Sequence, residues 1–167
     1  MAAAERGLCL IFSPNKDFAM TKTAPVSVPR ILIGASGSLD ALKLPQYLRG
    51  IRNAIDCSLT VMFTPNAAKF VNMDSIALLA ERVISGDRTC DWPTDKPGKI
   101  AADHDILAVM PATANTLSAV ANGSSLNRLT TVILAAEFPV LFFPVMGGPM
   151  WQKPAVRRNV AQIREDG

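Results

Sequence analysis

The chain has 167 residues, of which 49% are hydrophobic and 19% are charged, and its formal net charge is +3. This composition suits one globular domain with a sizeable core and excludes a disordered chain. A single histidine, and three cysteines without a CxxC pair, argue against a metal site or a disulfide framework. A Ser-His-Asp hydrolase would depend on His104 alone, so we expect a bound cofactor to supply the chemistry.

The basic residues are scattered singly or in pairs, such as Arg157-Arg158, without interleaved aromatics. This scatter argues against nucleic-acid binding. The most apolar stretch is interrupted by Glu137, Pro139 and Pro144, so no segment is long enough to span a bilayer. The N-terminus lacks the pattern of a secretory signal. We therefore expect a cytoplasmic protein with no membrane partner.

Residues 1–29 mix Ala, Ser, Thr, Pro and Lys without periodicity and are predicted to form a flexible tail. Beyond them, short apolar runs alternate with segments whose apolar residues recur at helical spacing. The predicted strands lie at 31–33, 58–63, 106–110 and 140–143. The predicted helices lie at 44–55, at 117–121, at 126–135, and around Val156, Val160 and Ile163 with Pro154 in the first turn.

One further helix is predicted over 76–83, capped by Asp74 or Ser75, and the polar stretch 87–99 is predicted to be a loop. The alternation predicts a single α/β domain over 30–167, with a Rossmann-like (flavodoxin-like) parallel sheet and helices on both faces. The sequence stops just after the last predicted helix, where another strand is expected. The domain is therefore predicted to lack an ordered C-terminal segment.

Ligands of open α/β sheets bind at the carboxyl ends of the strands. Four loops follow the predicted strands there, at 34–38, 64–66, 111–116 and 144–151. In the first loop, the hydroxyls of Ser36 and Ser38 suit a phosphate, although an ordinary tight turn explains the same residues equally well. The second loop has no Asp or Glu to hold a ribose diol, which argues against NAD and favours flavin mononucleotide (FMN).

The third loop offers hydroxyl and amide groups on a slim backbone, as the polar edge of a flavin ring requires. Alternatively, Asn115 or Thr116 simply caps the next helix. The fourth loop combines a Gly-Gly turn with Met and Trp side chains. Such a surface can form a wall beside a flavin or a thiol substrate, or it can be a packed hydrophobic corner.

Two of these loops carry the residues of a family resemblance. They read Pro111-Ala112-Thr113-Ala114-Asn115-Thr116 and Pro144-Val145-Met146-Gly147-Gly148-Pro149-Met150-Trp151. These runs resemble the PASANT and PxMNxxMW signatures of the homo-oligomeric flavin-containing cysteine decarboxylases, which include epidermin-type peptidyl-cysteine decarboxylases and phosphopantothenoylcysteine decarboxylases. The resemblance covers the chain from about Arg30 to its end, and includes Ala35-Ser36-Gly37-Ser38, Ala121-Asn122-Gly123 and Asn127-Arg128-Leu129-Thr130-Thr131.

The resemblance implies FMN rather than FAD as cofactor, and oxidative decarboxylation of a cysteine. In that reaction the flavin takes a hydride equivalent from the cysteine, and CO₂ leaves from the resulting thioaldehyde to give an enethiol. It also implies homotrimers or a dodecamer of trimers. The residues that it assigns to FMN are Gly37, Ser38, Thr64, Phe70, Thr113, Asn115, Thr116 and Ala135. The residues that it assigns to the substrate side are Met146, Gly147, Gly148 and Met150.

Two positions depart from the family pattern. The position of the catalytic histidine falls at Pro97, so the catalytic residue is not identified, and Lys96 and Lys99 are candidates for its role. His104 precedes a strand, at the wrong end of the sheet for the site, and is predicted to be a surface residue rather than a base. Gly147 stands where the family has its carboxylate-binding Asn, which argues against phosphopantothenoylcysteine as substrate. Backbone amides at Gly147 and its neighbour, or a basic side chain, are the alternatives for holding that carboxylate.

The three cysteines are predicted to be bystanders, with Cys57 in the core, Cys9 in the tail and Cys90 in a loop. The leading hypothesis is FMN-dependent decarboxylation of the C-terminal cysteine of a precursor peptide, for aminovinyl-cysteine formation in ribosomal peptide natural products. One alternative is phosphopantothenoylcysteine decarboxylation in coenzyme A synthesis. The other is a flavin-binding protein that is non-catalytic or regulatory.

Overall fold

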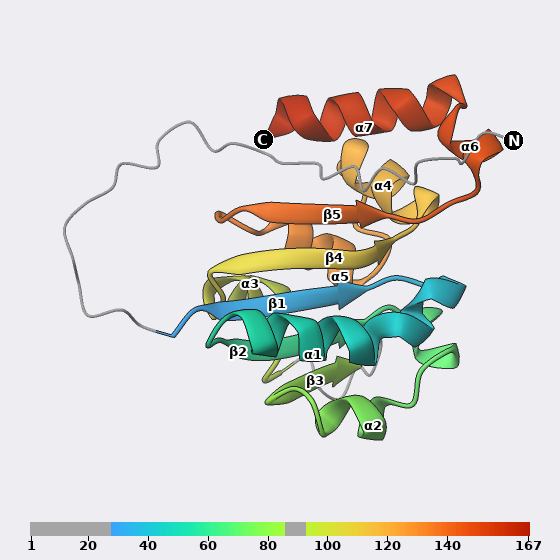
Figure 1. Ribbon diagram of the computed structural model, residues 1–167. Coiled ribbons are helices and arrows are strands. Elements are labelled where there is room, and N and C mark those ends of the chain that lie inside the picture. Colours follow the sequence, from blue (N-terminus) through green and yellow to red (C-terminus); the bar gives the residue numbers. More distant parts are fainter. Residues whose placement is uncertain (1–27, 86–92) are drawn as a thin grey trace, which may run out of the picture.

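The computed structural model describes residues 28–85 and 93–167. They contain a five-stranded sheet in the order β3-β2-β1-β4-β5, and every pairing is parallel. The strands are β1 (Arg30–Ala35), β2 (Ser58–Phe63), β3 (Arg82–Ser85), β4 (Ile106–Ala112) and β5 (Val140–Pro144). The predicted Rossmann-like parallel sheet is thus confirmed (Figure 1). The predicted tail lies outside the described residues, apart from its last two positions.

Helices cover both faces of the sheet because each strand buries side chains on both sides. In β1, Leu32 belongs to one core cluster, whereas Ile31 and Ile33 belong to the other. The first cluster packs against α3 (Pro97–Ala102), α4 (Ala114–Ala121), α5 (Arg128–Leu134) and α7 (Pro154–Asp166). The second packs against α1 (Leu44–Ala54), the short 3-10 helix η2 (Ala67–Lys69) and α2 (Met73–Ala77). Burial on both sides explains why the strands read as continuous apolar runs.

The helix predicted over 76–83 is wrong beyond Ala77. The helix α2 ends at Ala77, and Arg82–Ser85 form β3, in which Ile84 pairs with Met62 of β2. Four residues contain too few apolar positions to distinguish a strand from a helical turn, so pairing with β2 decides the outcome. The cap is also different, because the side chain of Asn72 accepts from the backbone N–H groups of residues 74 and 75.

The predicted loop over 87–99 is wrong at its end, because Pro97 opens the short helix α3. Proline at the first helical position has no N–H to leave unsatisfied, and Ile100 and Ala101 anchor the helix in the core. Residues 86–92, with Cys90, and the segment with Cys9 lie outside the described residues. Cys57 is buried, as predicted.

The last predicted helix is confirmed as α7, with Pro154 in its first turn. Its buried residues Val160 and Ile163 join the cluster that contains Leu117 of α4. In Figure 1, α7 lies alongside α4 beyond the edge strand β5. Within residues 28–85 and 93–167, no helix has the length and apolar character needed to cross a membrane.

Candidate functional site

A cavity of about 560 Å³ lies where the carboxyl ends of the strands meet. All arrowheads of the sheet point to this side of the molecule in Figure 1. The volume is within the range of about 300–1,000 Å³ that is usual for small-molecule sites. The lining comes from all four loops predicted from the sequence, and from the start of α5. It consists of Ser36, Gly37, Ser38, Thr64, Pro65, Asn66, Thr113, Ala114, Asn115, Thr116, Leu126, Asn127, Val145, Met146 and Met150.

Ser36 fastens the first loop to the third. Its buried hydroxyl donates to the carbonyl oxygen of Pro111 at 2.7 Å and accepts from the N–H of Thr113 at 3.0 Å. The hydroxyl hydrogen is therefore committed to the protein, and the expectation that Ser36 serves a phosphate is not supported. Ser38 differs, since among the described residues its hydroxyl makes one hydrogen bond, accepting from the N–H of Asp40 at 3.3 Å. Its hydrogen remains available for a ligand.

The first and second loops are in direct contact at Gly37. A Cβ at this glycine would lie 2.5 Å from the Cβ of Asn66, closer than real Cβ atoms approach. Only glycine therefore allows these loops to meet as they do. The buried Thr64 holds the second loop in place, because its N–H donates to the carbonyl of Ala35 at 3.0 Å and its hydroxyl accepts from Ala67. Outside the lining, Lys69 donates to Oδ1 of Asn66 at 2.9 Å.

The third loop starts helix α4, and Thr113 is its cap. The hydroxyl oxygen of Thr113 accepts from the N–H of Thr116 at 3.4 Å and lies 3.1 Å from the Thr116 hydroxyl. The cap is thus Thr113, two residues before Asn115, and neither Asn115 nor Thr116 caps the helix as the sequence suggested. Since Asn115 is not needed as a cap, its exposed side chain is left to face the cavity.

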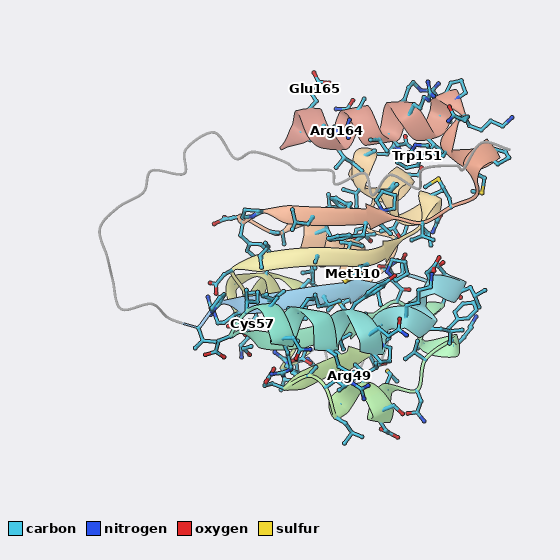
Figure 2. The ribbon with its side chains drawn as sticks, viewed as in Figure 1. Arg49, Cys57, Met110, Trp151, Arg164 and Glu165 are labelled. Carbon is cyan, nitrogen blue, oxygen red and sulfur yellow. The ribbon has the colours of Figure 1, made fainter. Side chains whose placement is uncertain are left out.

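The fourth loop contributes apolar side chains. Met146 and Met150 line the cavity, whereas Gly147 and Gly148 are exposed at the start of the four-residue helix α6 (Gly148–Trp151) and lie outside the lining. Figure 2 shows Trp151 on the inner side of α6 and α7, where it packs against the core. The packed-corner interpretation therefore applies to Trp151, and the wall interpretation applies to the two methionines.

Two residues assigned to FMN by resemblance stand apart from the cavity. Phe70 is 42% exposed and lies beside a separate shallow depression around η2. Ala135 ends α5, at the other end of that helix from the cavity. Four of the lining residues that sequence reasoning missed lie in the predicted loops, beside predicted site residues. The other two precede α5, and one of them, Asn127, had a signal of its own in the Asn127–Thr131 run. The missed residues are Pro65, Asn66, Ala114, Leu126, Asn127 and Val145.

The cavity lining, as far as the structure describes it, contains no ionisable side chain. Lys96 precedes α3, whereas Pro97 and Lys99 belong to that helix. None of these three residues lines the cavity. These candidates for the missing catalytic group therefore receive no support from the geometry.

The prediction that His104 is a surface residue is wrong, because it is 7% exposed. Its Nδ1 lies 2.6 Å from the carbonyl oxygen of Ile100, at the end of α3. Burial lowers the pKa of the imidazole. His104 stands just before β4 and hence at the opposite end of the sheet from the cavity.

A buried cation stands directly behind the cavity wall. Arg128 follows the lining residue Asn127, and its side chain is fully buried. Its guanidinium donates to the carbonyl oxygens of Ser85 and Asp95 and lies 3.9 Å from the Asp95 carboxylate. Arg82 pairs with the same carboxylate. These partners compensate the charge of Arg128, which turns away from the cavity.

A parallel sheet with a ligand-sized cavity at the carboxyl ends of its strands is typical of α/β proteins that bind nucleotide-like ligands. Within that class, the flavoprotein family model matches residues 20–167, and the chain belongs to this family. The resemblance predicted from the sequence motifs is thereby confirmed.

Relatives and solved structures agree with this assignment. The chain is 31% identical over 138 residues to the mersacidin decarboxylase of Bacillus sp. (strain HIL-Y85/54728). The matched segment covers 83% of this chain and 70% of that protein. The chain is 32% identical over 155 residues to the phosphopantothenoylcysteine decarboxylase of Mus musculus, covering 86% and 75%. The crystal structure of TvaF, an FMN-dependent cysteine decarboxylase from thioviridamide biosynthesis, matches with a TM-score of 0.76 and 35% identity over 83% of this chain and 86% of that chain.

Proposed function

We propose that this protein is an FMN-dependent decarboxylase of a C-terminal cysteine in a precursor peptide. The observation that carries the proposal is the cavity itself, an uncharged site built by four converging loops in a member of the flavoprotein family. Similarity to the cysteine decarboxylase TvaF supports a cysteine substrate, and similarity to the solved peptidyl-cysteine decarboxylase EpiD, at 26% identity and a TM-score of 0.75, supports a peptide.

The residues of the cavity fit FMN. Close backbone approach at Gly37 and the available hydroxyl of Ser38 suit the phosphate, next to the second loop with Thr64. Thr113, Asn115 and Thr116 offer donors and acceptors to the polar edge of the ring. We place Phe70 and Ala135 outside this assignment because they lie outside the cavity. FMN, rather than FAD, is proposed since TvaF is FMN-dependent.

The chain's own residues would bind and shield the reacting cysteine. FMN, when bound, supplies the two-electron oxidation that makes loss of CO₂ from the cysteine favourable. Met146 and Met150 present soft apolar surface that keeps water from the cysteine thiol. Gly147 and Gly148, exposed beside them, remain the proposed backbone contact for the terminal carboxylate. No proton transfer is assigned to Lys96 or Lys99.

Phosphopantothenoylcysteine is the second candidate substrate, favoured by the similarity to the mouse enzyme. Gly147 stands where the family has its carboxylate-binding Asn, and this departure argues for a peptide instead. We also propose that the chain assembles as a homotrimer or a dodecamer of trimers, which the molar mass from light scattering tests.

The experiment is a single turnover without oxygen, with purified FMN-loaded protein and a cysteine-terminated peptide. The expected result is a peptide lighter by CO₂ plus two hydrogens, with one flavin bleached for each product. A peptide that ends in serine is the matched control and should stay unchanged. Turnover of phosphopantothenoylcysteine alone would favour the second candidate. Binding of FMN without turnover of either compound would leave a flavin-binding protein and overturn the proposal.

A further inference from the structure

Asn127 begins helix α5 and lines the cavity with a half-buried side chain. Its Oδ1 accepts from the N–H of Thr130 at 3.0 Å, and its own N–H donates to the Thr130 hydroxyl oxygen at 3.0 Å. Its carbonyl oxygen accepts from the hydroxyls of Thr130 and Thr131, at 2.8 and 3.0 Å. This capping box fixes both the backbone and the carboxamide of Asn127.

The Nδ2 group of the fixed Asn127 carboxamide has no role in the fold. Because Oδ1 is held by the N–H of Thr130, Nδ2 must point away from α5. A flipped amide would place two donors against each other, so the orientation is unique. Within the described residues, Nδ2 of Asn127 has no hydrogen-bond partner. Because Asn127 lines the cavity, these two N–H donors are available to a ligand bound there.

Apart from the Ser38 hydroxyl, which we assign to the phosphate, most other polar side chains of the lining are bonded within the protein or exposed. The Ser36 hydroxyl bonds to the backbone, and the hydroxyls of Thr113 and Thr116 bond to one another. The side chain of Asn115 is exposed, and Oδ1 of Asn66 is held by an exposed lysine. Since no charged side chain stands in the described lining, an oxygen of a ligand must be bound by neutral donors.

We propose that Asn127 is a ligand-binding residue whose Nδ2 donates to an sp² oxygen of the bound molecule. Two sources share this chemistry, namely a ring carbonyl of the flavin and the carboxylate of the substrate cysteine. The inference rests on the proposed function in its choice of ligands. The side chain does the binding, and the amides of the short helix that it caps take no part.

The variant Asn127→Asp tests this directly. Aspartate keeps the cap and the shape but removes both donors and repels an oxygen. Asn72→Asp is the matched control, because Asn72 caps α2 through the same Oδ1 contacts outside the cavity. Both variants should unfold at the wild-type temperature. Asn127→Ser, which caps without an amide, separates loss of the donor from repulsion.

Two measurements distinguish the sources. If the oxygen belongs to the flavin, Asn127→Asp weakens FMN binding about 10- to 100-fold and shifts the flavin absorption band. If it belongs to the substrate, FMN affinity is kept, and the FMN-loaded variant binds the cysteine-terminated peptide about 10- to 100-fold more weakly in calorimetry. Asn127→Ser should show the same change at smaller amplitude, and Asn72→Asp should show neither.

Wild-type affinity of Asn127→Asp for both FMN and peptide would overturn the inference, as would a wild-type protein that binds neither. Equal weakening in Asn72→Asp would also overturn it, because the effect would then come from capping. Weakened binding in Asn127→Asp, together with a wild-type protein that releases no CO₂, would sustain the inference while the proposed function fails.

Discussion

The two ends of the sheet differ in how they are held together. At the amino end, ion pairs join strands to neighbouring segments, as in Arg30 with Asp105, whose atoms Nη2 and Oδ1 are 2.7 Å apart, and Arg52 with Glu81. At the carboxyl end, hydroxyl and backbone groups do this work, and Ser36 is the central example. Ion pairs therefore join segments at the amino end, whereas the described lining of the cavity at the carboxyl end contains no ionisable side chain.

The largest effect on stability is expected at Arg128, a buried charged residue that directly follows the cavity-lining residue Asn127. Arg128→Ala should lower the free energy of unfolding by about 3–5 kcal/mol, because it removes the guanidinium from buried carbonyls and from Asp95. Urea denaturation measures the change. Arg49→Ala is the control, an exposed arginine on α1 labelled in Figure 2, with an expected change within about 0.5 kcal/mol. Similar losses in both variants would show that the buried contacts add nothing.

Gly37→Ala should disrupt the loops at the carboxyl end of the sheet. The added Cβ forces the first and second loops apart, and overpacking of about 1–3 kcal/mol corresponds to FMN binding weakened about 10- to 100-fold. Fluorescence titration of FMN measures this. Gly50→Ala is the matched control, because a Cβ at Gly50 of α1 meets no atom within 4 Å. That variant should bind FMN normally and gain about 0.5–1 kcal/mol in stability.

Ser36→Ala sharpens the comparison, since it removes a single hydroxyl. The N–H of Thr113 loses its acceptor, and the expected loss in unfolding free energy is about 1–2 kcal/mol. FMN affinity should fall with it, because the first and third loops lose their fixed spacing. Ser38→Ala, at the half-buried cap of a short 3-10 helix, should weaken FMN binding with a smaller change in stability. An FMN affinity unaltered in Ser36→Ala would contradict the role given to this hydroxyl.

The smallest effect concerns the stability in acid of the ion pair at the amino end of the sheet. Hydrogen bonds from Arg30 lower the pKa of Asp105 below its ordinary value of 3.8. The folded state therefore gains stability above the ordinary pKa, and this gain disappears as the pH falls through the lowered one. In Asp105→Asn the acid dependence of unfolding should flatten by at most about 1 kcal/mol, because the pair is half exposed. Asp56→Asn, at an exposed position on the same end, should leave it unchanged.

Sequence patterns predicted what depends on local periodicity. The strand at 58–63 is found with the predicted bounds, because the five residues from Leu59 to Phe63 are all apolar or β-branched and form a short continuous run typical of a buried strand. The strand at 82–85 was missed because Val83 and Ile84 fit either period, and only pairing with β2 decides between them.

The remaining errors involve contacts between distant segments. His104, flanked by Asp103 and Asp105, has surface-like neighbours, but its ring is buried against Ile100 of a helix that the sequence did not predict. The loops around the cavity were found because the motifs follow strands. Which side chains face the cavity depends on backbone turns such as η2, which leaves Phe70 outside.

The bridge at Ser36 has a consequence for protein engineering. The first and third loops are joined by the Ser36 hydroxyl and by three main-chain groups, namely the Ser36 N–H, the Pro111 carbonyl and the Thr113 N–H. The lining residues Leu126, Met146 and Met150 take no part in these hydrogen bonds. Randomising these three positions should thus change substrate preference in a scaffold that keeps its flavin-binding geometry, which makes them the starting point for a library.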